Sequence, residues 1–446
     1  MKKYLFLLFI ITIISSCLDE NPANERYENS EIPSNNEIVF EKQLFGTGKS
    51  SFRNIIKGDN GFYVIASLDN SNTTANSQVG GTSINYILDP KIIKFNENGQ
   101  EVITITPNIN IYDVDVIPKG VLGNNEYVLV SGYDENENDP TDPDRTRLML
   151  YDSDMNIIST FERDFFQTIN DFKLISNLNN ELIYIGVGAV WNSGISYPCI
   201  FEFDINKSTK EIRYKNHWRF SDYNQDGETD EEFRDMEFYD VFVRNNELLI
   251  NGIMKSSSNE VRRIEIMTIG LDNIPVLKSW KAYGNNSDPI YLSPGQSILR
   301  NSSLLVIGSL EDEEKTKDRR SPFILNYDVN SEDKNYYKAI RESDNPDLFH
   351  SAEYINGKVL ACGIQSSYYS TNSDHNEATV GNGWFYSFDL EGGNKISEFT
   401  FGSKFNRTRI RDFIIGENFI WAVGLERTNL DFYRAALYKI DKSIIN

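Results

Sequence analysis

Residues 61–67 read GFYVIAS, and the same kind of segment returns six more times along the chain. Each copy is a turn, about four apolar residues and a small residue: NEYVLVSG (125–132), NELIYIG (180–186), NELLING (246–252), SSLLVIG (302–308), GKVLACG (357–363) and NFIWAVG (418–424). The small residues are Ser67, Gly132, Gly186, Gly252, Gly308, Gly363 and Gly424. A motif that returns roughly every 60 residues indicates a repeat architecture.

A second segment follows each copy of the first. It is an alternating apolar run that ends in Asp or Asn: KIIKFN (91–96), RLMLYD (147–152), CIFEFD (199–204), IMTIGLD (266–272), FILNYD (323–328), WFYSFD (384–389) and ALYKID (436–441). Period-2 alternation predicts half-buried strands, and Asp, Asn and Gly predict tight turns between them. With one strand before and one after these segments, each unit contains four strands.

Seven units of four strands predict an all-β chain folded as a seven-bladed β-propeller over residues 37–446. The last unit ends with its third strand, and residues 37–46 (EIVFEKQLFG) supply a candidate fourth. An N-terminal strand paired into the last blade would close the ring and remove its open edges. An open β-solenoid is the alternative, and it would need no such strand.

The first sixteen residues have the pattern of an export signal. Lys2 and Lys3 precede an apolar run over residues 4–14, which is too short to span a membrane. Residues 14–17, Ile-Ser-Ser-Cys, resemble the lipobox of bacterial lipoproteins. The resemblance implies cleavage after a signal peptide of residues 1–16 and acylation of Cys17. Residues 17–36 are then a lipidated cysteine and a flexible, acidic tether.

Asp19 and Glu20 resemble the surface-export signal of Bacteroidota lipoproteins. The resemblance implies an outer-membrane protein displayed on the cell surface, whereas a plain polar tether would also allow the periplasmic face. The repeat, with Phe-Gly at the end of a strand and Asp-Asn-Gly before the next, resembles propeller-like repeats of Bacteroidota secreted proteins. That resemblance implies a fold and no activity.

Charge and cysteine content limit the partners. The net charge of −22 argues against nucleic acid and against anionic lipid surfaces, so the expected membrane contact is the lipid anchor alone. Besides Cys17 the chain has Cys199 and Cys362, which fall in different units. They are therefore expected to be buried, unpaired residues.

The loops divide between two faces of the predicted ring. Turns between the first and second strands are tight, whereas several loops between the second and third strands are long: 68–85, 133–146, 187–197, 309–321 and 364–383. Insertions on one face often mark a binding face, although surface loops also lengthen neutrally. The aromatic residues in these loops are candidates for binding a protein or glycan partner, or else they cap the core: Trp191, Tyr197, Tyr368 and Tyr369.

One loop has the pattern of a calcium site. In the segment DYNQDGETDEE (222–232), oxygen ligands stand at loop positions 1, 3 and 5, with glycine at 6. The predicted ligands are Asp222, Asn224, Asp226, Glu228, Asp230 and Glu232. Phe233 occupies position 12, where the usual bidentate glutamate would stand. Calcium is expected to rigidify the loop, and a merely acidic turn is the alternative.

A polar residue recurs in the first strand of each unit: Asn54, Asp113, Asp171, Asp240, Ser351 and Asp412, with Gly295 in the fifth unit. Recurrence favours a structural role in bonding the backbone between blades over an acidic site in the central channel. Histidine is scarce and no nucleophile motif is present, so no catalytic residue is predicted. The sequence thus favours a non-catalytic binding or scaffold propeller; the alternative is a carbohydrate-active enzyme, a glycosidase or lyase, with carboxylates at the channel mouth.

Overall fold

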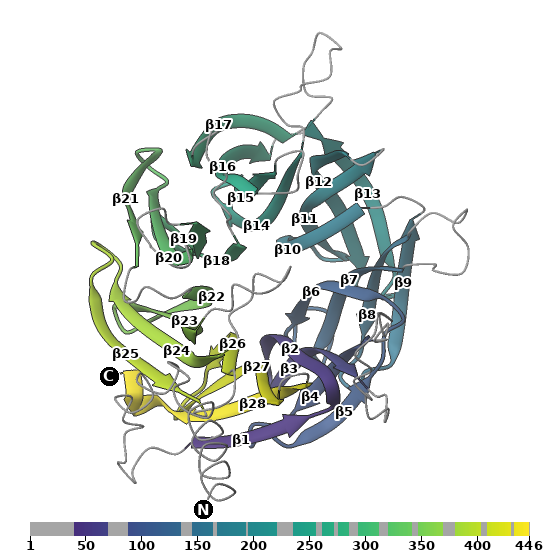
Figure 1. Cartoon of the computed structure of the whole chain (residues 1–446). Helices are drawn as coiled ribbons and strands as arrows, with labels where there is room; N and C mark the ends of the chain where they lie inside the picture. Colours follow the sequence, from purple (N-terminus) through teal and green to yellow (C-terminus); the bar gives the residue numbers. More distant parts are fainter. Residues whose placement is uncertain are drawn as a thin grey trace, which may run out of the picture.

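The computed structural model forms a ring of β-sheets (Figure 1). It describes residues 40–69, 88–134, 145–163, 167–192, 195–220, 235–255, 261–271, 275–284, 293–311, 320–340, 347–368, 380–402, 408–429 and 432–445. The signal peptide, Cys17 and the tether lie outside this part of the chain. No helix among the described residues is long and apolar enough to cross a membrane.

Each blade is an antiparallel sheet of four strands. The innermost strands are β2 (Thr47–Gly58), β6 (Asn110–Ile117), β10 (Gln167–Asn177), β14 (Met236–Arg244), β18 (Ser293–Arg300), β22 (Leu348–Ile355) and β26 (Thr408–Ile415). The second strands are β3 (Gly61–Asp69), β7 (Tyr127–Asp134), β11 (Glu181–Asn192), β15 (Glu247–Lys255), β19 (Ser303–Glu311), β23 (Lys358–Tyr368) and β27 (Phe419–Asn429).

The third strands are β4 (Leu88–Phe95), β8 (Arg145–Tyr151), β12 (Ile195–Asn206), β16 (Val261–Leu271), β20 (Arg320–Asp328), β24 (Val380–Asp389) and β28 (Phe432–Asp441). The outer strands of blades 1 to 6 are β5 (Glu101–Ile105), β9 (Ile157–Arg163), β13 (Ile212–Arg219), β17 (Pro275–Gly284), β21 (Asp333–Ala339) and β25 (Lys395–Phe401). A 3-10 turn, η3 (Lys442–Ile445), follows the last strand.

The ring is closed as the sequence predicts. The N-terminal strand β1 (Phe40–Phe45) pairs antiparallel with β28 and is the outer strand of blade 7. Each innermost strand contacts the innermost strands of both neighbouring blades, and β2 of the first blade contacts β26 of the last. This rules out the open solenoid and confirms the closed seven-bladed propeller (Figure 1).

The core is divided among the joints between blades. Each of seven apolar clusters draws its residues from two successive blades, including one that unites blades 7 and 1. Cys199 and Cys362 are unpaired and fully buried in two of these clusters, as predicted. Because each blade covers one face of the next, burial of apolar surface holds the ring together.

The predicted tight turns carry the backbone conformation that their residues favour. Asn245 and Asn246 join β14 to β15 with φ of 48° and 63°, and Asn356 and Gly357 join β22 to β23 with φ of 49° and 86°. Two successive residues with positive φ are typical of a type I′ hairpin turn, which matches the twist of paired strands.

Blade 3 departs from the sequence prediction in its long hairpin. β11 runs to Asn192 and β12 starts at Ile195, so the predicted loop 187–197 is mostly strand. β12 also continues past Asp204 to Asn206. The side-chain oxygen of Asn206 accepts hydrogen bonds from the backbone N–H groups of Ser208 and Thr209, at 2.9 and 3.0 Å, so Asn206 is the residue that forms the turn.

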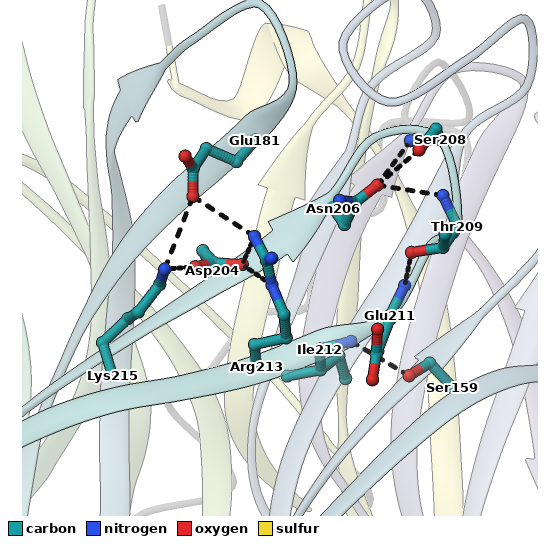
Figure 2. A network of polar contacts seen from close by, with 10 residues as sticks. All are labelled: Ser159, Glu181, Asp204, Asn206, Ser208, Thr209, Glu211, Ile212, Arg213 and Lys215. Atoms are coloured by element: carbon teal, nitrogen blue, oxygen red, sulfur yellow. Dashed lines mark hydrogen bonds and ion pairs between the residues drawn. The ribbon is translucent and has the colours of Figure 1, made fainter.

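Asp204 is therefore a buried ion-pair residue and not the turn residue that the sequence suggests. Its carboxylate is fully buried and is paired with Arg213 at 2.7 Å and with Lys215 at 2.6 Å (Figure 2). Glu181 lies beside the same two cations, at 3.3 Å from Arg213. Two cations for two carboxylates leave the group neutral, which suits a buried structural position.

Candidate functional site

All seven innermost strands carry a β-bulge at the equivalent position. The register of each strand shifts by one residue against the second strand of its blade. We call the extra residues the bulge residues: Arg53, Tyr112, Asn170, Tyr239, Gly295, His350 and Arg411. A bulge increases the twist of the strand and changes the direction of its side chains. Because every blade has one, the bulge is a regular structural feature of the inner wall of the ring.

The bulge explains the small residue that ends the first repeated segment. The residue before the bulge pairs with Ala66, Gly132, Gly188, Gly252, Gly308, Gly363 or Gly424. A Cβ on Gly363 would lie 1.8 Å from the carbonyl oxygen of Leu348, and one on Gly424 would lie 1.9 Å from that of Arg409. In units 1 and 3 the residues at this position are Ala66 and Gly188. The sequence repeat placed Ser67 and Gly186 there, and that assignment is wrong.

The polar residue after the bulge bonds the next blade, as the recurrence predicts. A carboxylate oxygen accepts the backbone N–H of a residue one blade further on. Asp171 accepts from Val241 at 2.8 Å, and Asp240 accepts from Ser297 at 3.2 Å. Asp412 accepts from Ile55 at 2.9 Å across the joint between blades 7 and 1. These carboxylates are thus structural links between blades.

Two blades use a different residue for this link. In blade 5 Gln296 does what the predicted Gly295 cannot, because its Oε1 accepts the N–H of Ala352 at 3.4 Å. The same Gln296 oxygen lies 2.7 Å from the Ser351 hydroxyl. The Ser351 hydroxyl in addition lies 2.6 Å from Oδ1 of Asp412 in the next blade. The chain of links therefore continues from blade 5 through blade 6 to blade 7.

Burial changes the acidity of these linking carboxylates. It raises the pKa of Asp240 to about 6, with help from the charge of Asp171, while hydrogen bonds from Ser297 and Asn251 lower it. It also raises the pKa of Asp412 to about 6, against hydrogen bonds from Ser351, Ile55 and Phe413. Desolvation penalises the charged form, so both groups take up a proton at a higher pH than a free aspartate.

Three acids of blades 2 and 3 converge on one lysine. Lys173 Nζ lies 2.7 Å from Asp171. Burial alone would lower the pKa of Lys173, but the charges of Asp171, Asp113 and Asp115 raise it. Burial and the charge of Asp171 raise the pKa of Asp113 well above its usual range, against the opposing effect of Lys173. The three acids and the lysine thus form one group of interacting charges on the inner wall.

Three of the four predicted aromatic binding residues lie near the ends of long strands. Tyr197 pairs with Val190 near the start of β12, and the guanidinium of Arg219 lies 5.5 Å from the centre of its ring. Trp191 and Tyr368 lie at the ends of β11 and β23, and their side chains lie outside the described part. Tyr369 lies outside the described residues altogether.

The predicted calcium ligands, Asp222 to Glu232, also lie outside the described residues, but both flanks of their segment are fixed. Phe220 before it is fully buried, and its ring packs 5.4 Å from that of Phe238. After it, the N–H of Asp235 donates to the carbonyl of Ser196 at 2.8 Å. Asp235, the first described residue after the segment, thus lies beside the start of β12, which carries Tyr197. Within the described ranges, no group of three acidic, His or Cys side chains could hold a metal ion.

These features define the chain as a seven-bladed β-propeller. No family model matches it, and no curated protein matches it. Solved structures with a similar ring include a Trypanosoma rangeli sialidase in complex with 2,3-difluorosialic acid, 12% identical over 87% of this chain and 54% of that one, with a TM-score of 0.38.

An uncomplexed Pyrococcus horikoshii acylaminoacyl peptidase is 11% identical over 88% of this chain and 51% of that one, with a TM-score of 0.43. Drosophila Plexin A in complex with Semaphorin 1b is 10% identical over 90% and 87%, with a TM-score of 0.37. The chain thus spans about half the length of the sialidase and of the peptidase. Likeness at this level carries no argument about this chain.

Proposed function

We propose that this protein is a lipid-anchored, surface-displayed propeller of the Bacteroidota type that binds a protein or glycan partner and catalyses no reaction. The inner-wall carboxylates carry this proposal. A glycosidase or lyase needs carboxylates that can reach its substrate, whereas Asp171, Asp240 and Asp412 each accept a backbone N–H from the next blade. Acids that hold the ring together are poorly suited to moving protons.

Partner binding belongs to the face that carries the long strand ends and the predicted calcium segment. The hydrogen bond between Asp235 and Ser196 brings the end of that segment next to Tyr197 and Arg219. An aromatic ring and a guanidinium are frequent anchors in binding surfaces. Calcium held by Asp222, Asn224, Asp226, Glu228, Asp230 and Glu232 would order this surface and supply no chemistry.

The melting temperature with and without calcium tests this proposal. We expect a rise of several degrees in millimolar calcium over chelator, because a ligand that binds only the folded state stabilises it. The rise should vanish in the Asp222→Ala, Asp226→Ala double variant and remain in Asp152→Ala, an acidic turn residue on the opposite face. Equal melting temperatures in calcium and chelator would remove calcium from the proposal.

Glycan-array binding tests the surface itself. Binding should weaken at least tenfold in Tyr197→Ala and should be unaffected in Tyr337→Ala, an exposed tyrosine of the outer strand β21. Protease treatment of intact cells should release the propeller if Cys17 anchors it at the surface, and protection from protease would place it in the periplasm.

The carbohydrate-active alternative is favoured by one observation, the raised pKa of Asp113 beside Asp171 and Lys173. A carboxyl group whose pKa is raised by burial and by a neighbouring carboxylate is a feature of a glycosidase acid. Turnover of a glycan by the purified chain, lost in Asp113→Asn, would establish this function and overturn the non-catalytic one.

A further inference from the structure

The connections between strands divide the surface of the propeller into two faces. We call the turn face the side where each first strand turns into the second and each third strand turns into the outer one. We call the loop face the opposite side, where second strands continue to third strands and outer strands to the next blade. Because neighbouring strands of a blade are antiparallel, the connections alternate between these two sides. Tyr197, near the start of a third strand, lies toward the loop face.

The N-terminal strand enters the propeller from the turn face. β28 is the third strand of blade 7, so it runs from the loop face to the turn face. β1 is antiparallel to β28, and its first residue, Phe40, pairs with Ile440 near the end of β28. β1 therefore starts at the turn face and runs along the outside of blade 7 (Figure 1). The part of the chain before Phe40 is thus connected to the ring at its turn face.

Contacts along β1 fix this direction. Its pairing with β28 is unbroken from Phe40 to Phe45. Lys42 Nζ lies 2.8 Å from the carboxylate of Glu426, and Lys439 Nζ lies 3.5 Å from that of Glu41. Entry from the loop face would require β1 to reverse its direction and to lose this whole register together with both ion pairs.

The predicted tether is short in comparison with the height of a blade. A flexible chain as long as residues 17–36 has an average end-to-end distance of about 25 Å. A strand of eight residues such as β6 spans roughly the same distance, because each residue adds about 3.3 Å. With the loop face against the membrane, the tether would have to run along the full height of blade 7. With the turn face against the membrane, no part of its length is used in this way.

Charge also distinguishes the two faces. The segments 134–144, 222–232 and 311–314 contain acidic residues and no basic ones. Each segment begins at or after the end of a strand that runs to the loop face, namely β7, β13 and β19. The turns of the opposite face carry basic residues as well, such as Lys119 and Lys207. An anionic lipid surface repels acidic segments, so the loop face is the less favourable one to place against it.

We propose that the anchored propeller stands with its turn face toward the membrane and its loop face away from it. This orientation rests on the anchor at Cys17 that is part of the proposed function. The start of β12, with Tyr197, then lies on the side away from the lipid. The partner of this face therefore comes from the surrounding medium and not from within the membrane.

Energy transfer from a fluorescent label to a labelled lipid tests the orientation. The lipidated full chain is reconstituted into vesicles of phosphatidylcholine and phosphatidylglycerol that contain an acceptor-labelled lipid. Asp154→Cys carries the label in an exposed turn of blade 2 on the turn face, and Asn108→Cys carries it at an exposed position between blades 1 and 2 on the loop face. Cys199 and Cys362 are fully buried, so the label reacts with the new cysteine.

We expect the label at position 154 to transfer about twice as much energy as the label at position 108, because the two faces are roughly 25 Å apart. Glu391→Cys places the label in an exposed turn of blade 6, across the ring from blade 2, and should match position 154 (Figure 1). The Asp154→Cys chain that also carries Cys17→Ser has no anchor and gives the baseline.

The outcomes separate the orientation from the anchor. Equal or greater transfer from position 108 in a chain that sediments with the vesicles would overturn the orientation and leave the anchor in place. High transfer from only one of positions 154 and 391 would mean that the ring stands on its edge, which also overturns the orientation. A lipid-free chain that does not sediment with the vesicles would overturn the proposed anchor and the orientation with it.

Discussion

The outer edge of blade 7 is built differently from the outer edges of the other six blades. Each outer strand in blades 1 to 6 bulges by one residue: Val102, Ile158, Lys215, Lys278, Asn335 and Ile396. β1 instead pairs with β28 in unbroken register from Phe40 to Phe45. The six bulged strands follow their partners through a turn, whereas β1 comes from the opposite end of the chain. Because no turn connects β1 to β28, only the contacts of β1 itself hold it in the sheet.

Those contacts come from side chains on both faces of β1. Lys42 binds both carboxylate oxygens of Glu426 at 2.9 and 2.8 Å. Arg434 donates to the carbonyl of Leu44 at 3.1 Å. The ring of Phe45 lies 5.2 Å from that of Phe52 in blade 1, which ties the closing strand to the next blade. Bulges discourage edge pairing in the other blades, and on β1 the exposed Glu41 and Lys42 serve that purpose.

Removal of β1 should have the largest effect. We expect a chain that starts at Gly46 to melt at least 10 °C below one that starts at Glu37, because it loses a strand ladder and the buried parts of Leu44 and Phe45. Circular dichroism melting measures this, and a peptide of residues 37–46 should restore part of the loss. Equal melting temperatures would mean that closure contributes nothing to stability.

Loss of an ion pair should have a smaller effect on stability than loss of β1. This effect should be larger at the outer edge of blade 7 than at that of blade 4. Glu426→Gln should lower the free energy of unfolding by about 1–2 kcal/mol, because the carboxylate is buried while Lys42 is partly exposed. Glu247→Gln is the matched control: it removes the exposed pair between the second and outer strands of blade 4, with Lys278 at 2.7 Å, and should cost under about 0.5 kcal/mol. Denaturant unfolding compares them, and equal losses would contradict a special role for the closing edge.

The sequence predicts blade number and closure well because both depend on local signals. Alternating apolar residues and turn residues recur within each unit, and the unpaired last strand points to the first. Register is harder, since a bulge depends on the neighbouring strand. CIFEFD (199–204) and WFYSFD (384–389) look alike, yet Asp389 accepts from Asn394 in its turn while Asp204 is buried in an ion pair. The ladder between β11 and β12 extends two residues beyond Asp204, to Asn206, whereas the ladder between β23 and β24 ends at Asp389. Asp204 therefore lies within a strand and not in the turn.

The candidate sites were predictable only in part. The structural role of Asp171, Asp240 and Asp412 follows from their recurrence. The bulge in each innermost strand does not, because the bulge residues, among them Arg53, His350 and Arg411, have no common residue type. Their common signal is position, one residue before the recurring polar residue. Ring closure brings blades 6, 7 and 1 together, and no spacing within one unit shows that.

The last prediction concerns the inner edge, where blade 7 resembles the others. Asp412 links blade 7 to blade 1 as Asp240 links blade 4 to blade 5, and burial raises both pKa values from 3.8 to about 6. Between about pH 4 and pH 6 these two groups therefore hold more protons in the folded chain than in the unfolded chain. From these groups, stability should fall as pH rises through this window and level off above it.

Asp412→Asn and Asp240→Asn should each reduce this slope by similar amounts, at most about 1.4 kcal/mol per pH unit for one proton. Urea unfolding at pH 4.5, 5.5, 6.5 and 7.5 measures the slope, and Asp152→Asn on the outer turn is the control. A change in Asp412→Asn alone would show that the closing joint differs at its inner edge as well as its outer edge. Equal changes would confine the difference between blade 7 and the other blades to the strand that closes the ring.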